Sequence, residues 1–135
     1  MSSYLFLWNP TKDPRSFHDY SRVIADAAAG KAYVTRWICP SRRPQPGDLA
    51  YLQRTGPSNN GLFARGVVTR AVFKRDDGIQ VVQLSLDRFL PLGAEISRAE
   101  ILAHADFSGR WMPMASGNVI PEPIETAIRE LWPKH

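Results

Sequence analysis

Cysteine is almost absent from the sequence. The single Cys39 cannot form an internal disulfide, which suits a reducing compartment. Long apolar runs are absent too, since none approaches the roughly 20 residues that a membrane-spanning helix needs. The apolar stretch at residues 4–8 has no basic residues before it and runs straight into Asn9-Pro10, which predicts a strand and not a secretion signal. We therefore expect a cytoplasmic protein with no membrane partner.

The sequence also lacks the common patterns of catalysis and metal binding. Its three histidines, His18, His104 and His135, are widely separated, and no Cys or His pair has the spacing of metal ligands. It contains no G-x-S-x-G, Walker A or G-x-G-x-x-G run. We therefore expect no catalytic residues, no metal and no organic cofactor. The enzyme alternative is a hydrolase that uses Cys39, and a pocket holding Cys39 or His104 beside an acidic residue would favour it.

What the sequence does contain is typical of one globular domain over residues 1–135, with 44% hydrophobic and 22% charged residues. Lysine and arginine total 17 against 13 acidic residues, a net charge of +4, and 13 of the 17 are arginine. Arginine offers a planar fork for phosphates and stacks on bases. This balance favours polyanions as partners without identifying one.

Strand and helix patterns follow one another in the order β-α-β-β-β-β-α-α. The expected strands cover residues 4–8, 33–38, 49–54, 62–73 and 80–89, and the expected helices cover residues 14–29, 97–103 and 121–131. Asp13 before Pro14 marks the first helix start, and Ser97 with Glu100 forms a capping box. Strands that follow one another without crossover helices favour an α+β fold, a mixed or antiparallel sheet curled into a small β-barrel with flanking helices.

Aromatic residues at strand ends are the main positive signal of function. Trp8 precedes Asn9, and Trp37 lies between Arg36 and Ile38. Aromatic rings beside Arg and Asn suit a pocket for a nucleic-acid base, where stacking contributes about 1–3 kcal/mol per base. The alternative is that these rings form the core. We expect a core position for Tyr4, Phe6, Phe17, Phe73 and Trp132.

Arginines form the second constellation. Arg42, Arg43 and Arg54 border the loops near Trp37 and are candidates, with Arg36, for phosphate contacts at the rim of a pocket. Strict alternation along residues 62–73 would place Arg65 and Arg70 on opposite faces, so we expect no single basic stripe there. The alternative is a set of dispersed, solvated arginines.

Six segments, taken in order over nearly the whole chain, resemble an EVE domain, a member of the PUA-like superfamily. They are Tyr-Leu-Phe-Leu-Trp-Asn-Pro at 4–10, Arg36-Trp37, Gly47-Asp48, Tyr-Leu-Gln-Arg-Thr-Gly at 51–56, Gly-Leu-Phe-Ala-Arg-Gly-Val-Val at 61–68 and Ser-Gly-Asn-Val-Ile-Pro at 116–121. The resemblance implies a curled PUA-like barrel with a cleft on one side. Related YTH domains hold a methylated adenine of RNA in an aromatic cage, and EVE domains are associated with reading modified bases.

The resemblance places Trp37 as a wall of such a cage, with Phe63 in the segment that supplies another wall, a tryptophan in YTH domains. Ser116 and Asn118 would contact the edge of the base. The expected base-binding pocket consists of Trp8, Asn9, Trp37, Ile38, Phe63, Ser116 and Asn118, and the expected phosphate contacts are Arg36, Arg42, Arg43 and Arg54.

The sequence therefore predicts a nucleic-acid-binding module, for RNA or DNA, that recognises a modified base flipped into an aromatic pocket. We expect a monomer, and any cutting activity would need a separate effector protein. The alternative is a domain that binds a nucleotide, a nucleoside or another small molecule in the same pocket, with the basic rim idle. Salt dependence separates the two, because phosphate contacts release counterions.

Overall fold

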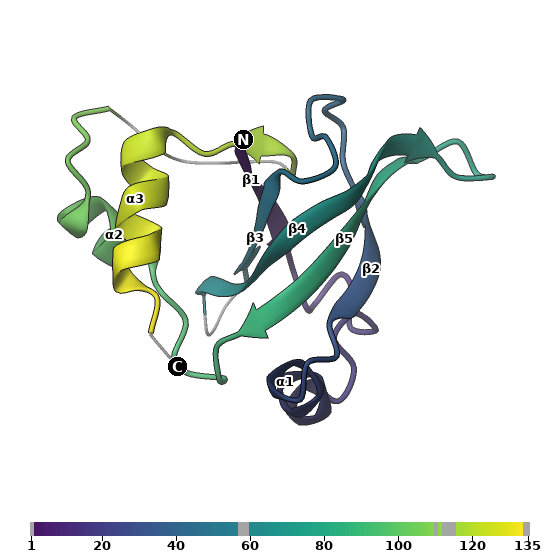
Figure 1. Cartoon of the computed structure of the whole chain (residues 1–135), viewed down its shortest axis with the longest axis horizontal. Coiled ribbons are helices and arrows are strands. Elements are labelled where there is room, and N and C mark those ends of the chain that lie inside the picture. Colours follow the sequence, from purple (N-terminus) through teal and green to yellow (C-terminus); the bar gives the residue numbers. More distant parts are fainter. Residues whose placement is uncertain (1, 57–59, 110, 112–115, 134–135) are drawn as a thin grey trace.

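The computed structural model describes residues 2–56, 60–109, 111 and 116–133. The strands are β1 (Ser3–Trp8), β2 (Tyr33–Ile38), β3 (Leu49–Arg54), β4 (Gly61–Lys74), β5 (Gln80–Phe89) and β6 (Asn118–Val119), and the helices are α1 (Tyr20–Ala28), α2 (Arg98–His104) and α3 (Glu122–Leu131) (Figure 1). The expected α+β class is confirmed. None of the described helices is long and apolar enough to cross a bilayer.

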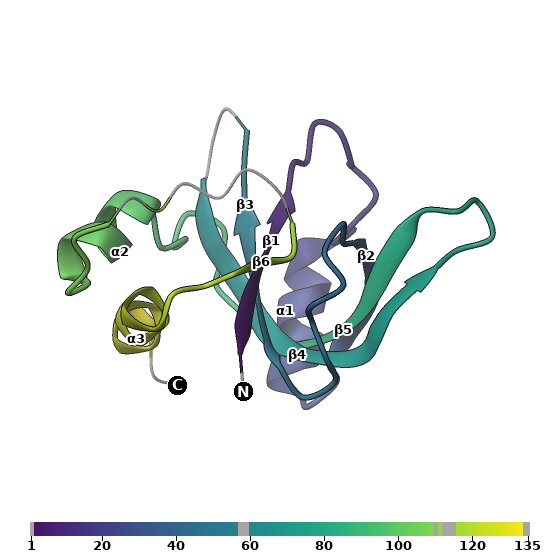
Figure 2. The ribbon, with the colours of Figure 1, turned by 90° about the horizontal axis from the view of Figure 1, so that it is seen from above.

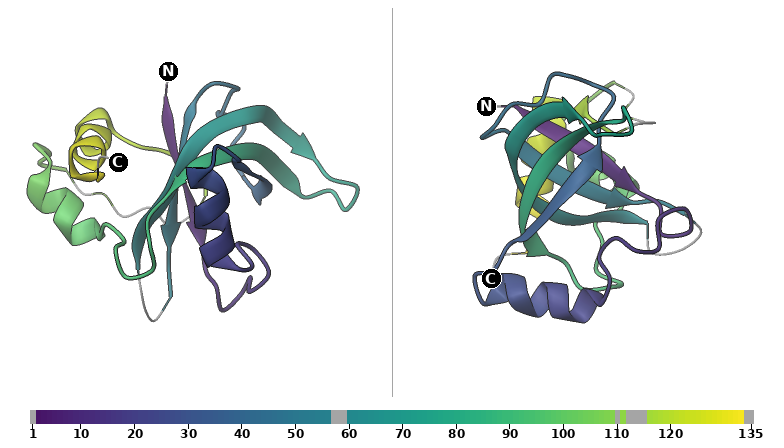
Figure 3. Two further views of the ribbon diagram at one scale, coloured as in Figure 1. Left: turned by 60° about the horizontal axis from the view of Figure 1, so that its bottom comes forward. Right: turned by 90° about the vertical axis from the view of Figure 1, so that its right-hand side faces the viewer.

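One mixed sheet holds the strands in the order β2-β5-β4-β3-β1-β6. β1 and β3 run parallel, while the other neighbours are antiparallel. The sheet curls until its β2 edge approaches β1, where the Trp37 indole Nε1 donates to the carbonyl of Leu7 at 3.1 Å (Figure 3).

The mixed sheet is curled as expected but does not close into the expected β-barrel, because in the described residues no strand ladder joins β2 to β1 or β6. Side-chain contacts, and not a ladder of backbone hydrogen bonds, connect β2 to β1 across this seam. Next to the Trp37 contact, a Cβ on Gly117 would lie 2.7 Å from the Cys39 Sγ, so the two sides of the seam are closely packed there.

The sheet separates two apolar clusters. The inner cluster lies within the curl, and α1 packs against β5 and β2 beside it. The outer cluster lies under α2 and α3, which Figure 2 shows together on one side of the sheet, apart from α1. The inner cluster includes Tyr4, Phe6, Trp8, Phe17, Trp37, Leu52, Phe63, Val82, Leu84 and Leu86, and the outer one Leu5, Tyr51, Leu62, Ile101, Trp111, Ile124, Ile128 and Trp132.

The first helix begins later than the sequence predicts. We expected it from Pro14, but α1 begins at Tyr20. Phe17 and Asp19 have φ angles of 56° and 53°, in the left-handed region that a right-handed helix cannot include. The buried Phe17 ring belongs to the inner cluster. Local helix signals at Asp13-Pro14 therefore give way to tertiary packing of this ring.

β4 carries irregularities that change which side chains share a face. Gly66 lies at a close approach of two strands, since a Cβ there would clash with the Ser85 carbonyl oxygen. The register also shifts between Val68 and Arg70. Val68 pairs with Leu84 of the inner cluster, whereas Arg70 pairs with Gln83, the next residue on β5. Arg70 therefore lies on the outer face, the same face as Arg65, and the expected opposite placement is wrong.

The capping box of α2 is confirmed. The backbone N–H of Glu100 donates to Ser97 Oγ at 3.1 Å, and the Ser97 N–H donates to Glu100 Oε1 at 3.4 Å. Replacing Ser97 by Ala leaves an orphan donor in the first turn, so we expect the free energy of unfolding to fall by about 1 kcal/mol. Urea denaturation followed by tryptophan fluorescence measures the change. Ser21→Ala, on an exposed position of α1, is the control, and equal effects of the two substitutions would contradict the cap's role.

Candidate nucleic-acid interface

The three aromatic residues predicted for the pocket, Trp8, Trp37 and Phe63, come together around Phe17. The Phe17 ring centroid lies 4.9 Å from that of Trp8, 5.7 Å from that of Trp37 and 5.2 Å from that of Phe63. Trp8 and Phe63 also contact each other, with centroids 5.4 Å apart. All of these side chains are buried, Trp37 at 8% exposure. The centre of this group is thus filled by a side chain of the chain itself.

The polar edges of both tryptophans are satisfied within the chain. Trp8 Nε1 donates to the Asp13 carbonyl at 2.9 Å, and Trp37 Nε1 donates to that of Leu7. Four hollows on the described residues are lined by other side chains, and none of these four includes Trp8, Trp37 or Phe63. In this structure the three rings therefore pack on protein.

Of the other residues predicted for the pocket, Ser116 meets Leu7 as Trp37 does, while Asn118 and Ile38 are exposed. Asn9 accepts the Thr11 N–H through its side-chain oxygen at 3.0 Å, and Ser116 Oγ accepts the Leu7 N–H at 2.9 Å. Asn118 is exposed on β6. Ile38 is 53% exposed and, as the strand neighbour of Trp37, lies on the opposite face of β2.

Arg54, one of the predicted phosphate contacts, is buried. Its Nη1 lies 2.5 Å from Glu95 Oε2, and the two side chains are only 5% and 4% exposed. The guanidinium carbon lies 5.1 Å from the centroid of Trp8 and 5.0 Å from that of Phe63. Burial beside this pair raises the pKa of the Tyr20 hydroxyl, which donates to the Leu90 carbonyl. Arg54 therefore acts inside the fold, as the partner of Glu95.

Two exposed cations, Arg36 and Arg70, lie on the outer face of β2 and β4. The register aligns Arg36, Gln83 and Arg70 across β2, β5 and β4. The Phe73 ring lies beside both arginines, with its centroid 3.6 Å from the Arg70 guanidinium carbon and 5.4 Å from that of Arg36. The expected core position of Phe73 is wrong, because its half-buried ring lies with Val81 on the outer face of the sheet.

Two hollows adjoin one another at the hairpin and share Lys74, whose strand pair with Gln80 directly follows the Phe73–Val81 pair. One, of about 500 Å³, is lined by Arg36, Arg70, Phe73, Lys74, Arg75, Asp76 and Asp77. The other, of about 480 Å³, is lined by Ile38, Pro40, Arg42, Lys74, Gly78, Ile79 and Gln80. We call the two hollows and their lining residues the hairpin face, because they lie around the β4–β5 hairpin at the right of Figure 1.

Most cations of the hairpin face are not neutralised by the chain. Arg75 pairs with Asp77 at 2.7 Å. Among the residues that the structure describes, Arg36, Arg70 and Lys74 form no ion pair, and neither does Arg42, whose Nε donates to Gln80 Oε1 at 3.0 Å. Arg43, the residue after Arg42, is exposed but lines neither hollow. The surface thus offers cationic groups that are free to meet an anion.

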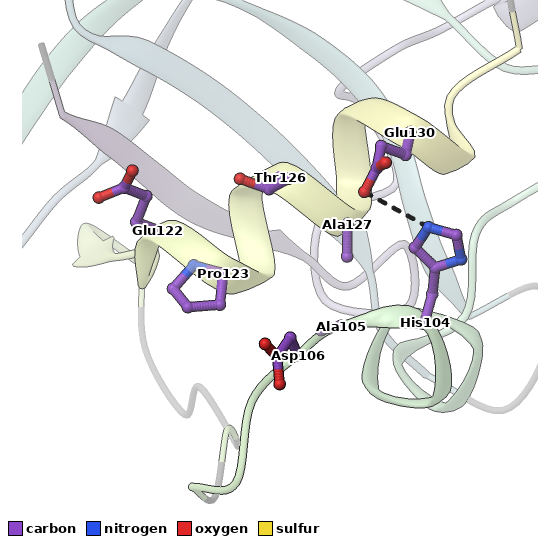
Figure 4. Close-up of a pocket in the computed structure, with 8 residues that line it drawn as sticks. All are labelled: His104, Ala105, Asp106, Glu122, Pro123, Thr126, Ala127 and Glu130. Carbon is purple, nitrogen blue, oxygen red and sulfur yellow. Dashed lines mark ion pairs between the residues drawn. The ribbon is translucent and has the colours of Figure 1, made fainter.

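The cleft between α2 and α3 has the opposite character (Figure 4). This hollow of about 370 Å³ is lined by Asp106, Glu122 and Glu130 together with His104, whose Nε2 lies 3.5 Å from Glu130 Oε1. His104 beside Glu130 in a pocket is the arrangement that was expected to favour the hydrolase alternative. Cys39, however, is fully buried at the sheet seam, where its thiol donates to the Ser41 carbonyl and burial raises its pKa. The cleft therefore lacks the expected nucleophile, and no metal-binding group of three ligands occurs in the described residues.

The sequence did not single out Arg70, Phe73 and Lys74 as candidate interface residues. The Asp-Asp-Gly turn at 76–78 was available as a signal, since counting outward from it pairs Phe73 with Val81. Two further facts were not available from sequence: that β2 pairs with β5, and that the β4 register shifts before Arg70.

Comparison with known proteins informs the fold and not the function. No protein-family model matches the chain, and no curated protein matches it. A solved structure of a hypothetical protein from Leishmania major is similar, with a TM-score of 0.65 and 13% sequence identity, covering 97% of this chain and 94% of that one. At this identity the likeness shows a shared α+β fold over nearly the whole chain.

Proposed function

We propose that this chain is a cytoplasmic, PUA-like nucleic-acid-binding module that contacts its ligand through the hairpin face. The observation that carries the proposal is a set of exposed cations, Arg36, Arg42, Arg70 and Lys74, which have no acidic partner among the described residues and line two adjoining hollows. Neutralising phosphates and releasing their counterions supplies most of the free energy of non-specific nucleic-acid binding. The overall charge of +4 favours the same encounter.

The proposal keeps the expected partner class and moves the interface. Of the predicted phosphate contacts it retains Arg36 and Arg42, while Arg54 belongs to the interior. Recognition of a modified base stays a prediction of the EVE resemblance, because a base reaching Trp37 would have to displace the Phe17 ring that packs there.

The test is fluorescence anisotropy of a labelled oligothymidylate strand and of its duplex with oligoadenylate, titrated with the protein at several salt concentrations. We expect affinity to fall as salt rises. The double variant Arg36→Gln/Arg70→Gln should weaken binding and lower the slope of log affinity against log salt by about one to two, since each lost phosphate contact removes about 0.7–0.9.

The matched control is Lys12→Gln/Arg15→Gln, which removes the same charge from exposed positions in the segment between β1 and α1. It should leave the slope nearly unchanged. Equal losses in both double variants would place the interface elsewhere, and the absence of salt-dependent binding to either probe would overturn the proposal. Free thymidine that binds as tightly as the oligonucleotide, without a salt effect, would favour the small-molecule alternative.

A further inference from the structure

We infer that the ligand of the hairpin face is a single-stranded nucleic acid, one base of which stacks on the Arg70–Phe73 pair while its phosphates lie beside Lys74. This inference rests on the proposed function and specifies the form of nucleic acid that the surface selects. Its basis is the combination of a preordered cation and exposed apolar side chains on the outer face with positive charges at the hairpin that form no ion pair among the described residues.

The Arg70 guanidinium lies at stacking distance over the Phe73 ring, with its carbon 3.6 Å from the ring centroid. Arg36, from the neighbouring edge strand, approaches the same ring at 5.4 Å. A cation–π contact of this kind holds the guanidinium in place, so less side-chain entropy is lost when a ligand binds. The Arg70 side chain is exposed, so in the inferred complex a base lies on the side of the guanidinium turned away from Phe73 and the N–H edges meet phosphate oxygens.

Apolar side chains accompany these cations. Val34 and Ile38, on the same face of β2 as Arg36, are 60% and 53% exposed, and Ile79 at the hairpin is 39% exposed. A duplex presents sugars and phosphates to a protein surface and keeps the flat faces of its bases inside its own stack. Unpaired bases expose those faces, and they bury apolar and aromatic protein surface when they stack on it. The bases of a single strand can therefore pack on the apolar part of the hairpin face, whereas those of a duplex cannot.

The charges mark a path for the backbone of that strand. Lys74 lines both hollows, with Arg36 and Arg70 in one and Arg42 in the other. Phosphates on either side of the stacked base would thus meet cations in each hollow. Asp76 and Asp77 border one of the hollows at the hairpin turn, so the cationic path ends there.

The experiment compares a labelled oligothymidylate strand of about ten nucleotides, within the usual site size of a small single-strand-binding domain, with the duplex of equal length. We expect the full chain to bind the single strand about tenfold more tightly than the duplex at the same salt concentration, because only the single strand stacks. Phe73→Leu should weaken single-strand binding by about tenfold while leaving duplex binding unchanged. Phe73→Tyr should restore it, since a tyrosine ring also holds the guanidinium.

Two further variants keep the result interpretable. Phe107→Leu makes the same change at a half-buried position beside the outer cluster and should leave both affinities unchanged. Arg70→Lys retains the charge but removes the planar guanidinium, so it should also lose about tenfold in single-strand affinity. This variant tests the stacking contact independently if Phe73→Leu does not fold. Equal or tighter duplex binding, or an Arg70→Lys variant with full single-strand affinity, would overturn the inference and leave the proposed function standing. Absence of binding to both probes would overturn the proposed function itself.

Discussion

Trp37→Ala is expected to lower the free energy of unfolding by about 3–5 kcal/mol, the usual cost of truncating a large buried aromatic side chain. Trp37 is 8% exposed and packs on Phe17 in the inner cluster. Its indole also joins β2 to β1 across the open seam through the Leu7 carbonyl. Because domains of this size are stable by only about 5–15 kcal/mol, the loss should show as a large shift of the urea midpoint.

Trp37→Phe separates the two contributions of this side chain. It retains much of the ring volume and leaves the Leu7 carbonyl without its donor, so we expect a smaller loss, about 1–3 kcal/mol. The opposite outcome is equally informative. If Trp37→Ala keeps its full stability and loses affinity for an oligonucleotide that carries a methylated base, Trp37 forms the wall of a base pocket, as the EVE resemblance implies.

Features that depend on neighbouring residues were predictable from the sequence. The strand patterns at 33–38 and 49–54 match β2 and β3 residue for residue, and the capping box of α2 lies where Ser97 and Glu100 place it. Gly66 belongs with them, since a glycine inside a strand pattern marks a bulge or a neighbouring backbone, and a close approach is what the structure has there. Each of these signals is contained in a few consecutive residues.

Features that depend on distant partners were not predictable. Nothing near Phe17 in the sequence indicates that its ring packs in the inner cluster. This packing accompanies the left-handed backbone at Phe17 and Asp19, and α1 therefore begins only at Tyr20. A bulge between Val68 and Arg70 leaves no mark in the sequence, yet it turns Arg70 toward Arg36 and Phe73. Only part of the candidate interface was therefore predictable. Arg36 and Arg42 could be proposed from the sequence, whereas Arg70, Phe73 and Lys74 on the hairpin could not.

Arg54 illustrates the same limit for a buried charge. An arginine at the end of a strand, followed by a polar loop, has the sequence pattern of a surface residue. Its partner Glu95 lies 41 positions along the chain, so the sequence alone cannot show that the two meet. The structure places them together among the rings of Trp8, Tyr20 and Phe63.

Arg54→Met is expected to lower the free energy of unfolding by about 3–5 kcal/mol, because it leaves the buried Glu95 carboxylate without its counter-ion. Glu95→Leu removes the partner charge and should have a similar effect, since it strands the guanidinium. In the double variant Arg54→Met/Glu95→Leu neither charge remains to be desolvated. We therefore expect it to be more stable than either single variant, which a double-mutant cycle by urea denaturation measures.

Arg75→Met is the matched control, because Arg75 and Asp77 form an ion pair in solvent, and its loss should change stability by less than about 1 kcal/mol. Arg54→Met with an equally small effect would contradict the buried pair. The same variant distinguishes the interior from the interface. Because the Arg54 side chain is only 5% exposed and faces Glu95, Arg54→Met should leave the salt slope of nucleic-acid binding unchanged wherever the protein remains folded, unlike Arg36→Gln/Arg70→Gln.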